Sequence, residues 1–325
     1  MKKTKLVLIY NSPAIWVEND LEILSENYET KALFINSFRD YNVQNLKSLM
    51  TADIYYFWFG SLIFFPAILL ASFLRRKKIV VAGGYDVAAY HKENYGAFTF
   101  SFVSRLFRRI FFLFADKILA VSRFTKNEAI KNANIKSHKI EVIYNTVKNF
   151  YVNDEFRKKS VIMVANIDDE RYRIKGFDRL LELAKAMPDV CFTHVGKIST
   201  DIAKNISFPK NLKLCGHYTE SQLIELYKKH SHALQPSRYE SFCMTIIEAA
   251  ACGCYPITSD EGALPEVIDG IGKAVSFDSL DNVIGSVRKE LTIERSAKDI
   301  SIRTLDKYGF SVRQKKLLEY LRGFL

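Results

Sequence analysis

Apolar runs of five to seven residues alternate along the chain with longer stretches of helical spacing. The runs are residues 5–10, 31–36, 53–59, 78–84, 117–122, 140–145, 161–166, 190–196, 211–216, 232–237, 255–259 and 273–277. Most are rich in valine, isoleucine or aromatic residues, a composition typical of β-strands. Strands that alternate with helices predict parallel sheets joined by right-handed crossovers, and therefore an α/β fold.

Twelve strands are too many for one ordinary doubly wound sheet, so we expect two Rossmann-like domains. The periodicity lapses at residues 145–160, where polar residues cluster before the next strand. The predicted domains are residues 1–150 and 151–308. Ligands of such sheets bind at the carboxyl ends of the strands. We therefore expect a binding cleft with both sheets facing it.

Charge is unevenly distributed between the two predicted domains. Residues 1–150 carry 21 Lys/Arg and 12 Asp/Glu, a balance of +9 out of the net +11 of the 325-residue chain. A basic domain beside a nearly neutral one suggests an anionic partner, such as a membrane surface, a phosphorylated acceptor or nucleic acid. A merely soluble basic surface is the alternative.

All five cysteines lie in the second half of the chain, at positions 191, 215, 243, 252 and 254. None has a paired metal-ligand spacing with histidines, so we expect no metal site and reduced thiols in a cytoplasmic protein. The apolar run near the N-terminus is short and is followed by acidic residues, which favours a first strand over a signal peptide.

Residues 54–74 contain no charged residue and precede four basic residues, so they qualify by length as a membrane span. However, Gly60 and Ser61 divide the segment, Pro66 lies in its second part, and another strand follows. This pattern favours a strand, a loop and a short helix within a buried sheet.

Residues 98–114 combine many phenylalanines with one polar stripe at helical spacing, formed by Ser101, Ser104, Arg105 and Arg108. An interfacial helix with its arginines among phospholipid head groups explains this pattern, and so does a helix packed on both sides inside the first domain. Arginines interleaved with aromatic residues also suit RNA stacking. Because no nucleic-acid motif accompanies them, we expect no nucleic-acid partner.

Two glutamates, Glu240 and Glu248, lie eight positions apart in a segment of otherwise apolar and small residues. The strand at 232–237 leads into a turn at 238–241, and a helix follows over residues 242–253. Glu240 is then expected at the carboxyl edge of the sheet and Glu248 about two turns into the helix, on a face that looks back toward the edge. The apolar residues between them argue against a solvated helix face.

The segment PSRYESFCMTIIEAAACGCYPITSDEGALPEVI resembles the donor-site signature of glycosyltransferase family 4, whose members are retaining enzymes with the GT-B fold. Four further segments match the family in the same order along the chain: ADKILAVSRFTKNEAI, KIEVIYNTV, KGFDRLLELAKAMPDVCFTHVG and LCGHYTESQLIELYKKHSHALQPS. Together they cover roughly residues 115–270. The resemblance also implies that the last helix, residues 309–325, packs back on the first domain.

The resemblance implies that Glu240 binds sugar hydroxyls of a nucleotide-sugar donor and that Glu248 binds its ribose. Carboxylates form charge-assisted hydrogen bonds with such hydroxyls. The backbone amides of Phe242, Cys243 and Met244 open a helix N-terminus, which is suited to the diphosphate.

Lys175 resembles the family lysine that neutralises the leaving diphosphate. An arginine usually precedes it in the motif, but Asn166 occupies the aligned position, and the nearby insertion supplies Arg171 and Arg173 instead. Either arginine is a candidate for the diphosphate, with a solvated loop as the alternative.

Two further positions resemble donor-pocket residues of the family. Glu266 matches another family carboxylate, and Gly216 lies where family members approach the base, with His217 and Tyr218 beside it. We expect Gly216 to act through its backbone.

The first domain departs from the family pattern. The glycine-rich loop after the first strand is missing, and Gly83 stands where many members carry a histidine. Asp86 is a candidate for orienting the acceptor or contacting the donor sugar. His91 could replace the missing histidine if its loop folded back.

The resemblance implies a metal-independent, retaining glycosyltransferase that uses a UDP- or GDP-linked sugar donor and no other cofactor. The expected acceptor is a glycan or a lipid-linked precursor, met at the inner face of the plasma membrane. Two alternatives stay open: a catalytically degenerate subunit that binds sugar nucleotides, and a GT-B phosphorylase or epimerase.

Overall fold

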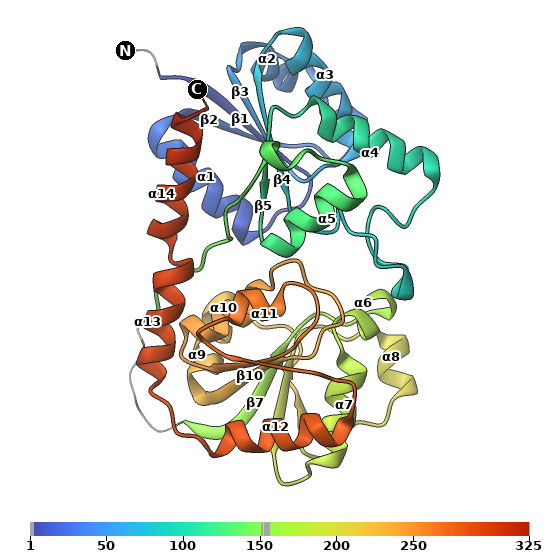
Figure 1. Ribbon diagram of the computed structural model, residues 1–325, viewed down its shortest axis with the longest axis vertical. Coiled ribbons are helices and arrows are strands. Elements are labelled where there is room, and N and C mark those ends of the chain that lie inside the picture. The colour runs from blue at the N-terminus through green and yellow to red at the C-terminus, as the bar shows by residue number, and fades with distance from the viewer. Residues whose placement is uncertain (1–2, 151, 153–156, 325) are drawn as a thin grey trace. The chain divides into compact units, whose positions relative to one another are not determined.

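The computed structural model describes residues 3–150, 152 and 157–324. The chain forms two compact units (Figure 1). Unit 1 comprises Met1–Thr146 and Arg313–Leu325, and unit 2 comprises Val147–Val312. The sequence pattern places the boundary at residue 150 and the return of the chain at residue 309.

Unit 1 contains a six-stranded parallel sheet in the order β2-β1-β3-β4-β5-β6. Its strands are β1 (Lys5–Tyr10), β2 (Glu29–Phe34), β3 (Ile54–Trp58), β4 (Lys77–Ala82), β5 (Lys117–Ala120) and β6 (Ile140–Val142). Its helices are α1 (Ile15–Asn27), α2 (Val43–Thr51), α3 (Phe65–Phe73), α4 (Phe102–Phe114), α5 (Arg123–Ala133) and most of α14 (Phe310–Arg322).

Unit 2 contains a second six-stranded parallel sheet, in the order β12-β11-β10-β7-β8-β9. Its strands are β7 (Lys158–Val164), β8 (Cys191–Val195), β9 (Leu212–Leu214), β10 (His230–Gln235), β11 (Tyr255–Ser259) and β12 (Lys273–Val275). Its helices are α6 (Asp169–Ile174), α7 (Phe177–Ala186), α8 (Thr200–Asn205), α9 (Glu220–Lys229), α10 (Met244–Ala251), α11 (Leu264–Ile268), α12 (Leu280–Thr292) and α13 (Ala297–Tyr308).

All twelve predicted strands are present and all pair in parallel, which confirms the α/β prediction of two doubly wound sheets. Helices cover both faces of each sheet. In unit 1, residues of α2, α3, α4 and α5 form the core on one face of the sheet, whereas α1 is absent from that cluster. In unit 2, α7 and α12 contribute to one core cluster, while α9, α10 and α13 pack together apart from it.

Residues 54–74 form strand β3 and helix α3, joined by a short 3-10 turn at Leu62–Phe64, as the pattern favours. All five residues of β3 are buried, because both faces of this central strand are covered. Within the described residues, no helix combines the length and the apolar character needed to cross a membrane.

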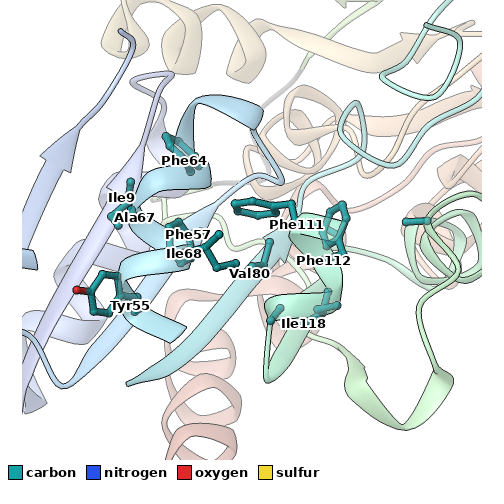
Figure 2. Packing of buried hydrophobic residues seen from close by; sticks show 14 of the residues in the cluster. Ile9, Tyr55, Phe57, Phe64, Ala67, Ile68, Val80, Phe111, Phe112 and Ile118 are labelled. Carbon is teal, nitrogen blue, oxygen red and sulfur yellow. The ribbon is translucent and has the colours of Figure 1, made fainter. Parts of the chain in front are cut away.

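The core of unit 1 is dominated by aromatic rings from β3 and α4 (Figure 2). Phe57 on β3 packs edge-on against Phe111 on α4, with ring centroids 5.7 Å apart. Phe112 fills the space above the backbone of Gly60, where a Cβ atom would lie 2.3 Å from the ring. Gly60 is therefore fixed by this close approach of ring to backbone.

In helix α4, Arg108 of the polar stripe is turned inward, whereas the interfacial hypothesis would place it among head groups. The Arg108 guanidinium donates a hydrogen bond to the carbonyl of Gly60 (3.2 Å), and burial lowers the pKa of Arg108. Phe102, Val103, Leu106, Phe107 and Leu113 are exposed instead. The helix is therefore not packed on both sides, and the side that it exposes is apolar rather than the polar stripe.

A buried ion pair ties α14 to the rest of unit 1. The Arg313 guanidinium donates to both carboxylate oxygens of Asp20 on α1, at 2.6 and 2.8 Å. Asp20 also accepts hydrogen bonds from Tyr56 and Trp58 on β3. Asp20 and Arg313 are 0% and 3% exposed, so both charges are removed from water and depend on each other.

Candidate active site

The strand order of unit 2 determines where a ligand can bind. The chain runs outward from β7 in one direction to β8 and β9, and in the other direction from β10 to β11 and β12. Such a reversal separates the loops at the carboxyl ends of the two central strands and leaves a crevice there. Lys175 is the C-cap of α6, in the connection between β7 and α7, and Glu240 lies in the loop after β10.

Lys175 and Glu240 meet at this edge. The Lys175 ammonium lies 2.8 Å from Glu240 Oε1. The same oxygen also accepts hydrogen bonds from Ser237 Oγ (3.0 Å) and Gln235 Nε2 (3.3 Å). Among the hydrogen bonds of the described residues, none is formed by Glu240 Oε2, which therefore remains available to a ligand hydroxyl.

The backbone of Glu240 is held as firmly as its side chain. Its carbonyl accepts a hydrogen bond from the amide of Ala263 at 2.8 Å. Gly262 packs against the Glu240 backbone so closely that a Cβ atom there would lie 2.7 Å from the Glu240 carbonyl oxygen. With φ at +64°, Gly262 also adopts a conformation that favours glycine.

Helix α10 begins at Met244, two residues later than the sequence pattern suggests. Cys243 is its N-cap and has a left-handed backbone with φ at +73°, which ends the preceding loop. Phe242 lies before the helix and is buried edge-on against Tyr308, with centroids 5.4 Å apart. Since the first N–H groups of a helix have no carbonyl partner within it, the amides at the start of α10 are suited to an anion, and their expected contact with the diphosphate stays a prediction.

Glu248 lies one turn into α10 rather than the expected two, because the helix starts later. Its side chain is half-buried. Burial raises its pKa to about 7, and the negative charge of Glu220 contributes in the same direction. More of this carboxyl group is therefore protonated near neutral pH than for an exposed glutamate.

Arg171 and Arg173 belong to α6, not to an irregular loop. Arg171 pairs with the N-cap residue Asp168, and Arg173 lies 3.8 Å from Asp178. Their side chains are 50% and 56% exposed, so both can move toward an incoming ligand. A role for either arginine at the diphosphate stays a prediction.

Arg238 was not singled out in the sequence, yet it connects the two loops of the site. Its guanidinium binds Asp178 through two hydrogen bonds of 2.7 and 2.8 Å and donates to the carbonyl of Arg173 at 2.8 Å. The amide of Arg238 also donates to the carbonyl of Ile174. These contacts fix the connection that carries Lys175 beside the loop that carries Glu240.

Gly216 and Glu266 occupy two other strand-end loops of unit 2. The carbonyl of Gly216 accepts a hydrogen bond from the amide of Gly196 at 2.7 Å, which joins the loops after β8 and β9. Its φ is +67° and no atom lies within 4 Å of a Cβ built there, so the backbone faces open space. Glu266 lies in the first turn of α11 and is half-buried.

Asp86 is located in unit 1 and is engaged by backbone groups. Its two carboxylate oxygens accept the N–H groups of Gly60 (2.7 Å) and Gly84 (2.9 Å), and the residue is 4% exposed. Burial raises its pKa, while these hydrogen bonds oppose the shift. In this position Asp86 holds the loops after β3 and β4 together, and its proposed contact with a substrate stays a prediction. His91 begins an exposed 3-10 turn.

Family models match most of both units. Residues 150–299 match the model "Glycosyl transferases group 1", and residues 38–148 match "Glycosyltransferase Family 4".

Curated relatives align over parts of their length. An uncharacterized 41.2 kDa protein in the cps region of Klebsiella pneumoniae is 26% identical over 60% of this chain and 60% of its own. One subunit of the human phosphatidylinositol N-acetylglucosaminyltransferase is 27% identical over 47% of this chain and 34% of its own. The chain therefore spans less than two thirds of the length of either relative.

Solved structures share the whole fold. Anabaena HepE, in a complex with UDP and glucose, superposes with a TM-score of 0.76 at 15% identity, covering 98% of this chain and 100% of the other. Sucrose-phosphate synthase from Thermosynechococcus elongatus gives a TM-score of 0.75 at 12% identity, with 99% of both chains covered. The two family matches therefore identify glycosyltransferase domains in both units, and the solved structures show that the chain has the fold of the GT-B glycosyltransferases.

Proposed function

We propose that the protein transfers a sugar from a nucleoside-diphosphate sugar to an acceptor hydroxyl, with retention of configuration and without a metal ion. The observation that carries this proposal is the Lys175–Glu240 pair at the carboxyl edge of the unit 2 sheet, next to the open N-terminus of α10. A cation, an oriented carboxylate and unpartnered amides are the groups that a sugar diphosphate requires. The complexes of HepE with UDP and glucose and with UDP-glucose support this class of donor.

The donor would extend across unit 2 from Glu240 to Glu248. Glu240 Oε2 accepts from a sugar hydroxyl, since Oε1 is already occupied by Lys175, Ser237 and Gln235. The first amides of α10 and the ammonium of Lys175 hold the diphosphate. Glu248, one turn further along the helix, accepts from the ribose hydroxyls.

Departure of the nucleoside diphosphate leaves negative charge on its terminal phosphate. Lys175 neutralises this charge, and a non-bridging oxygen of the leaving phosphate accepts the proton of the attacking hydroxyl on the same face of the sugar. Catalysis then depends on positioning and on electrostatic stabilisation. Glu240 acts in this scheme by orienting the sugar, because hydrogen bonds fix its carboxylate at one oxygen.

Calorimetry with UDP-, GDP- and other nucleotide sugars tests the donor class directly. One nucleotide is expected to bind, and the variant Glu240→Gln is expected to bind the free nucleotide normally but its sugar conjugate about 10-fold or more weakly, because one charge-assisted hydrogen bond is lost. If no nucleoside diphosphate or nucleotide sugar bound the purified protein, the proposal would be abandoned.

Donor affinity is expected to rise with pH through the pKa of Glu248. The raised pKa of about 7 leaves this carboxyl mostly protonated at low pH, and ionisation at higher pH makes it the stronger acceptor for the ribose. Between about pH 6 and pH 8 the association constant should increase up to about 10-fold. A nucleotide sugar is the appropriate probe, since the terminal phosphate of a free nucleotide titrates in the same range.

Two variants separate Glu248 from other titrating groups. Glu248→Gln should remove the pH dependence and keep the affinity low throughout. Glu220→Gln removes the neighbouring charge that also raises the pKa of Glu248, so it should move the midpoint to lower pH and leave the affinity at high pH unchanged. A wild-type pH profile that persisted in Glu248→Gln would show that another group controls it.

A donor-binding protein without catalytic activity is the second candidate, favoured by the loop after β4. Gly83 stands where the family resemblance places a histidine, and a Cβ atom at this position would lie 2.1 Å from the ring of Phe59. No side chain fits there unless Phe59 moves. Binding of a nucleotide sugar with neither transfer nor hydrolysis would favour this second candidate.

We propose a lipid-linked molecule or another glycan precursor as the acceptor. One curated relative is named as part of a phosphatidylinositol N-acetylglucosaminyltransferase, and that name includes a lipid. In unit 1, the strand order reverses between β1 and β3, and Asn11 after β1 bonds to Ser61 after β3 at 3.1 Å. This reversal marks the loops that an acceptor would contact.

A further inference from the structure

Helix α4 exposes an apolar face that nothing in the described chain covers. Phe102, Val103, Leu106 and Leu113 are 66%, 59%, 43% and 70% exposed. At 3.6 residues per turn these positions share one side of the helix, opposite the side on which Phe111 and Phe112 enter the core. An amphipathic helix on a soluble domain normally has the reverse orientation.

The inward contacts show what holds the helix in this orientation. Phe111 packs edge-on against Phe57 (Figure 2), and the ring of Phe112 closes over the backbone of Gly60. Arg108 lies on the same inward side and bonds to the carbonyl of Gly60. Turning the apolar residues inward would break these contacts, so their exposure follows from the packing of unit 1.

The exposed apolar surface continues onto the neighbouring helix. Helix α3 contacts α4, with the rings of Phe65 and Phe107 5.8 Å apart. On α3, Leu69 and Phe73 are 42% and 84% exposed. Large aromatic and aliphatic side chains therefore project from two adjacent helices of one unit. Single exposed apolar residues are common, but such a group indicates an interaction surface.

The charge around this surface is predominantly positive, although Arg76 and Lys78 pair with Asp53 and Asp116. Residues 65–82 and 98–115, which include both helices, contain seven Lys/Arg and no Asp or Glu. Arg75 follows α3 and Arg109 lies on α4, and both are exposed. The Arg109 side chain donates to the carbonyl of Asn132, which leaves its positive charge without a carboxylate partner in that contact.

We propose that the exposed faces of α3 and α4 dock on an anionic lipid bilayer, with the apolar side chains inserted among the acyl chains and Arg75 and Arg109 at the head groups. A predominantly basic rim matches an anionic surface. A second copy of the chain would present the same positive rim and would repel it. The docking extends beyond sugar transfer and does not depend on the donor or on catalysis.

Sedimentation with lipid vesicles tests the docking. The protein is expected to bind vesicles of phosphatidylcholine mixed with phosphatidylglycerol much more strongly than vesicles of phosphatidylcholine alone. The binding should weaken as salt screens the head-group charge. Equal binding to both kinds of vesicle, or to neither, would overturn the proposal.

Matched variants locate the contact. The double variant Phe102→Ser/Leu106→Ser should weaken vesicle binding about 30- to 100-fold, because two large side chains no longer insert. Arg109→Gln should weaken it about 5-fold, as expected for one head-group contact. Phe38→Ser is the control. Phe38 is 70% exposed in the 3-10 turn after β2, at the opposite edge of the sheet, and its replacement should leave binding unchanged.

Two further measurements keep the outcome interpretable. Nucleotide-sugar calorimetry on the same variants should give wild-type affinity, which shows that they fold and separates docking from the donor site. Light scattering should show that the chain does not associate through this face. A dimer that dissociates in Phe102→Ser/Leu106→Ser would identify the face as a contact between copies and overturn the proposal.

Discussion

Replacement of Lys175 by alanine is expected to lower turnover by about 100- to 1,000-fold, the loss typical of removing one donor that stabilises charge in a transition state. Lys175 is the cation paired with Glu240 at 2.8 Å, at the strand reversal of unit 2. In the proposed reaction it meets the negative charge of the leaving diphosphate. Turnover of the donor, by transfer or by hydrolysis, measured at saturating nucleotide sugar is the appropriate readout.

Controls separate this effect from a loss of fold. Lys185 is an exposed lysine near the end of α7 in the same unit, and Lys185→Ala should retain full turnover. Lys175→Arg keeps the charge but changes its position, so intermediate turnover is expected. If Lys175→Ala bound the nucleotide sugar and turned it over at the wild-type rate, the proposed role of Lys175 would be excluded.

Replacement of Arg313 by methionine is expected to lower the free energy of unfolding of unit 1 by about 3–5 kcal/mol, because it leaves the carboxylate of Asp20 buried without a cation. For a unit of this size the midpoint of thermal unfolding should fall by about 10 °C. Circular dichroism or calorimetry on the full chain measures the change.

A double variant that also replaces Asp20 provides the decisive comparison. Asp20→Asn/Arg313→Met should lose less stability than the two single variants added together, since the charges compensate each other. Arg322→Met, an exposed position in the last turn of the same helix, should change stability little. Additive losses in the double variant would show that the two side chains act independently.

The parallel sheets were predictable because their strands are short, apolar and β-rich, and each is followed by a helical stretch. Residues 54–74 show why local composition alone was insufficient: the charge-free segment resembles a membrane span, and only the break at Gly60 separates β3 from α3. The start of α10 was misplaced by two residues because Cys243, not a glycine, adopts the left-handed conformation at its N-cap. Residue type gave no signal for that turn.

The orientation of α4 could not be predicted because phenylalanines surround most of the helix. With apolar residues on nearly every side, periodicity identifies the polar stripe but not the direction in which it points. The direction is set by two long-range contacts, from Arg108 to the carbonyl of Gly60 and from Phe112 to the same glycine. Neither contact leaves a pattern in the local sequence.

The candidate site was predictable where a motif covers it and not elsewhere. Lys175 and Glu240 were expected to act on one donor, and the structure brings them into direct contact. Gln235 and Arg238 were missed, since their function is to hold other side chains and loops rather than a ligand. Asp86 was selected as a candidate to orient the acceptor or contact the donor sugar, and no sequence pattern indicated that its carboxylate accepts the backbone amides of Gly60 and Gly84.

The bond between Asp20 and Arg313 has a consequence for biosynthesis. The two residues are separated by 293 positions, so a ribosome adding about 5–20 residues per second makes the aspartate about 15–60 s before its partner. During that interval the nascent first unit must either leave α1 loosely attached or keep the carboxylate of Asp20 buried without its arginine partner. The portion of the chain that is translated first therefore reaches its final form only after the whole of unit 2 has been translated.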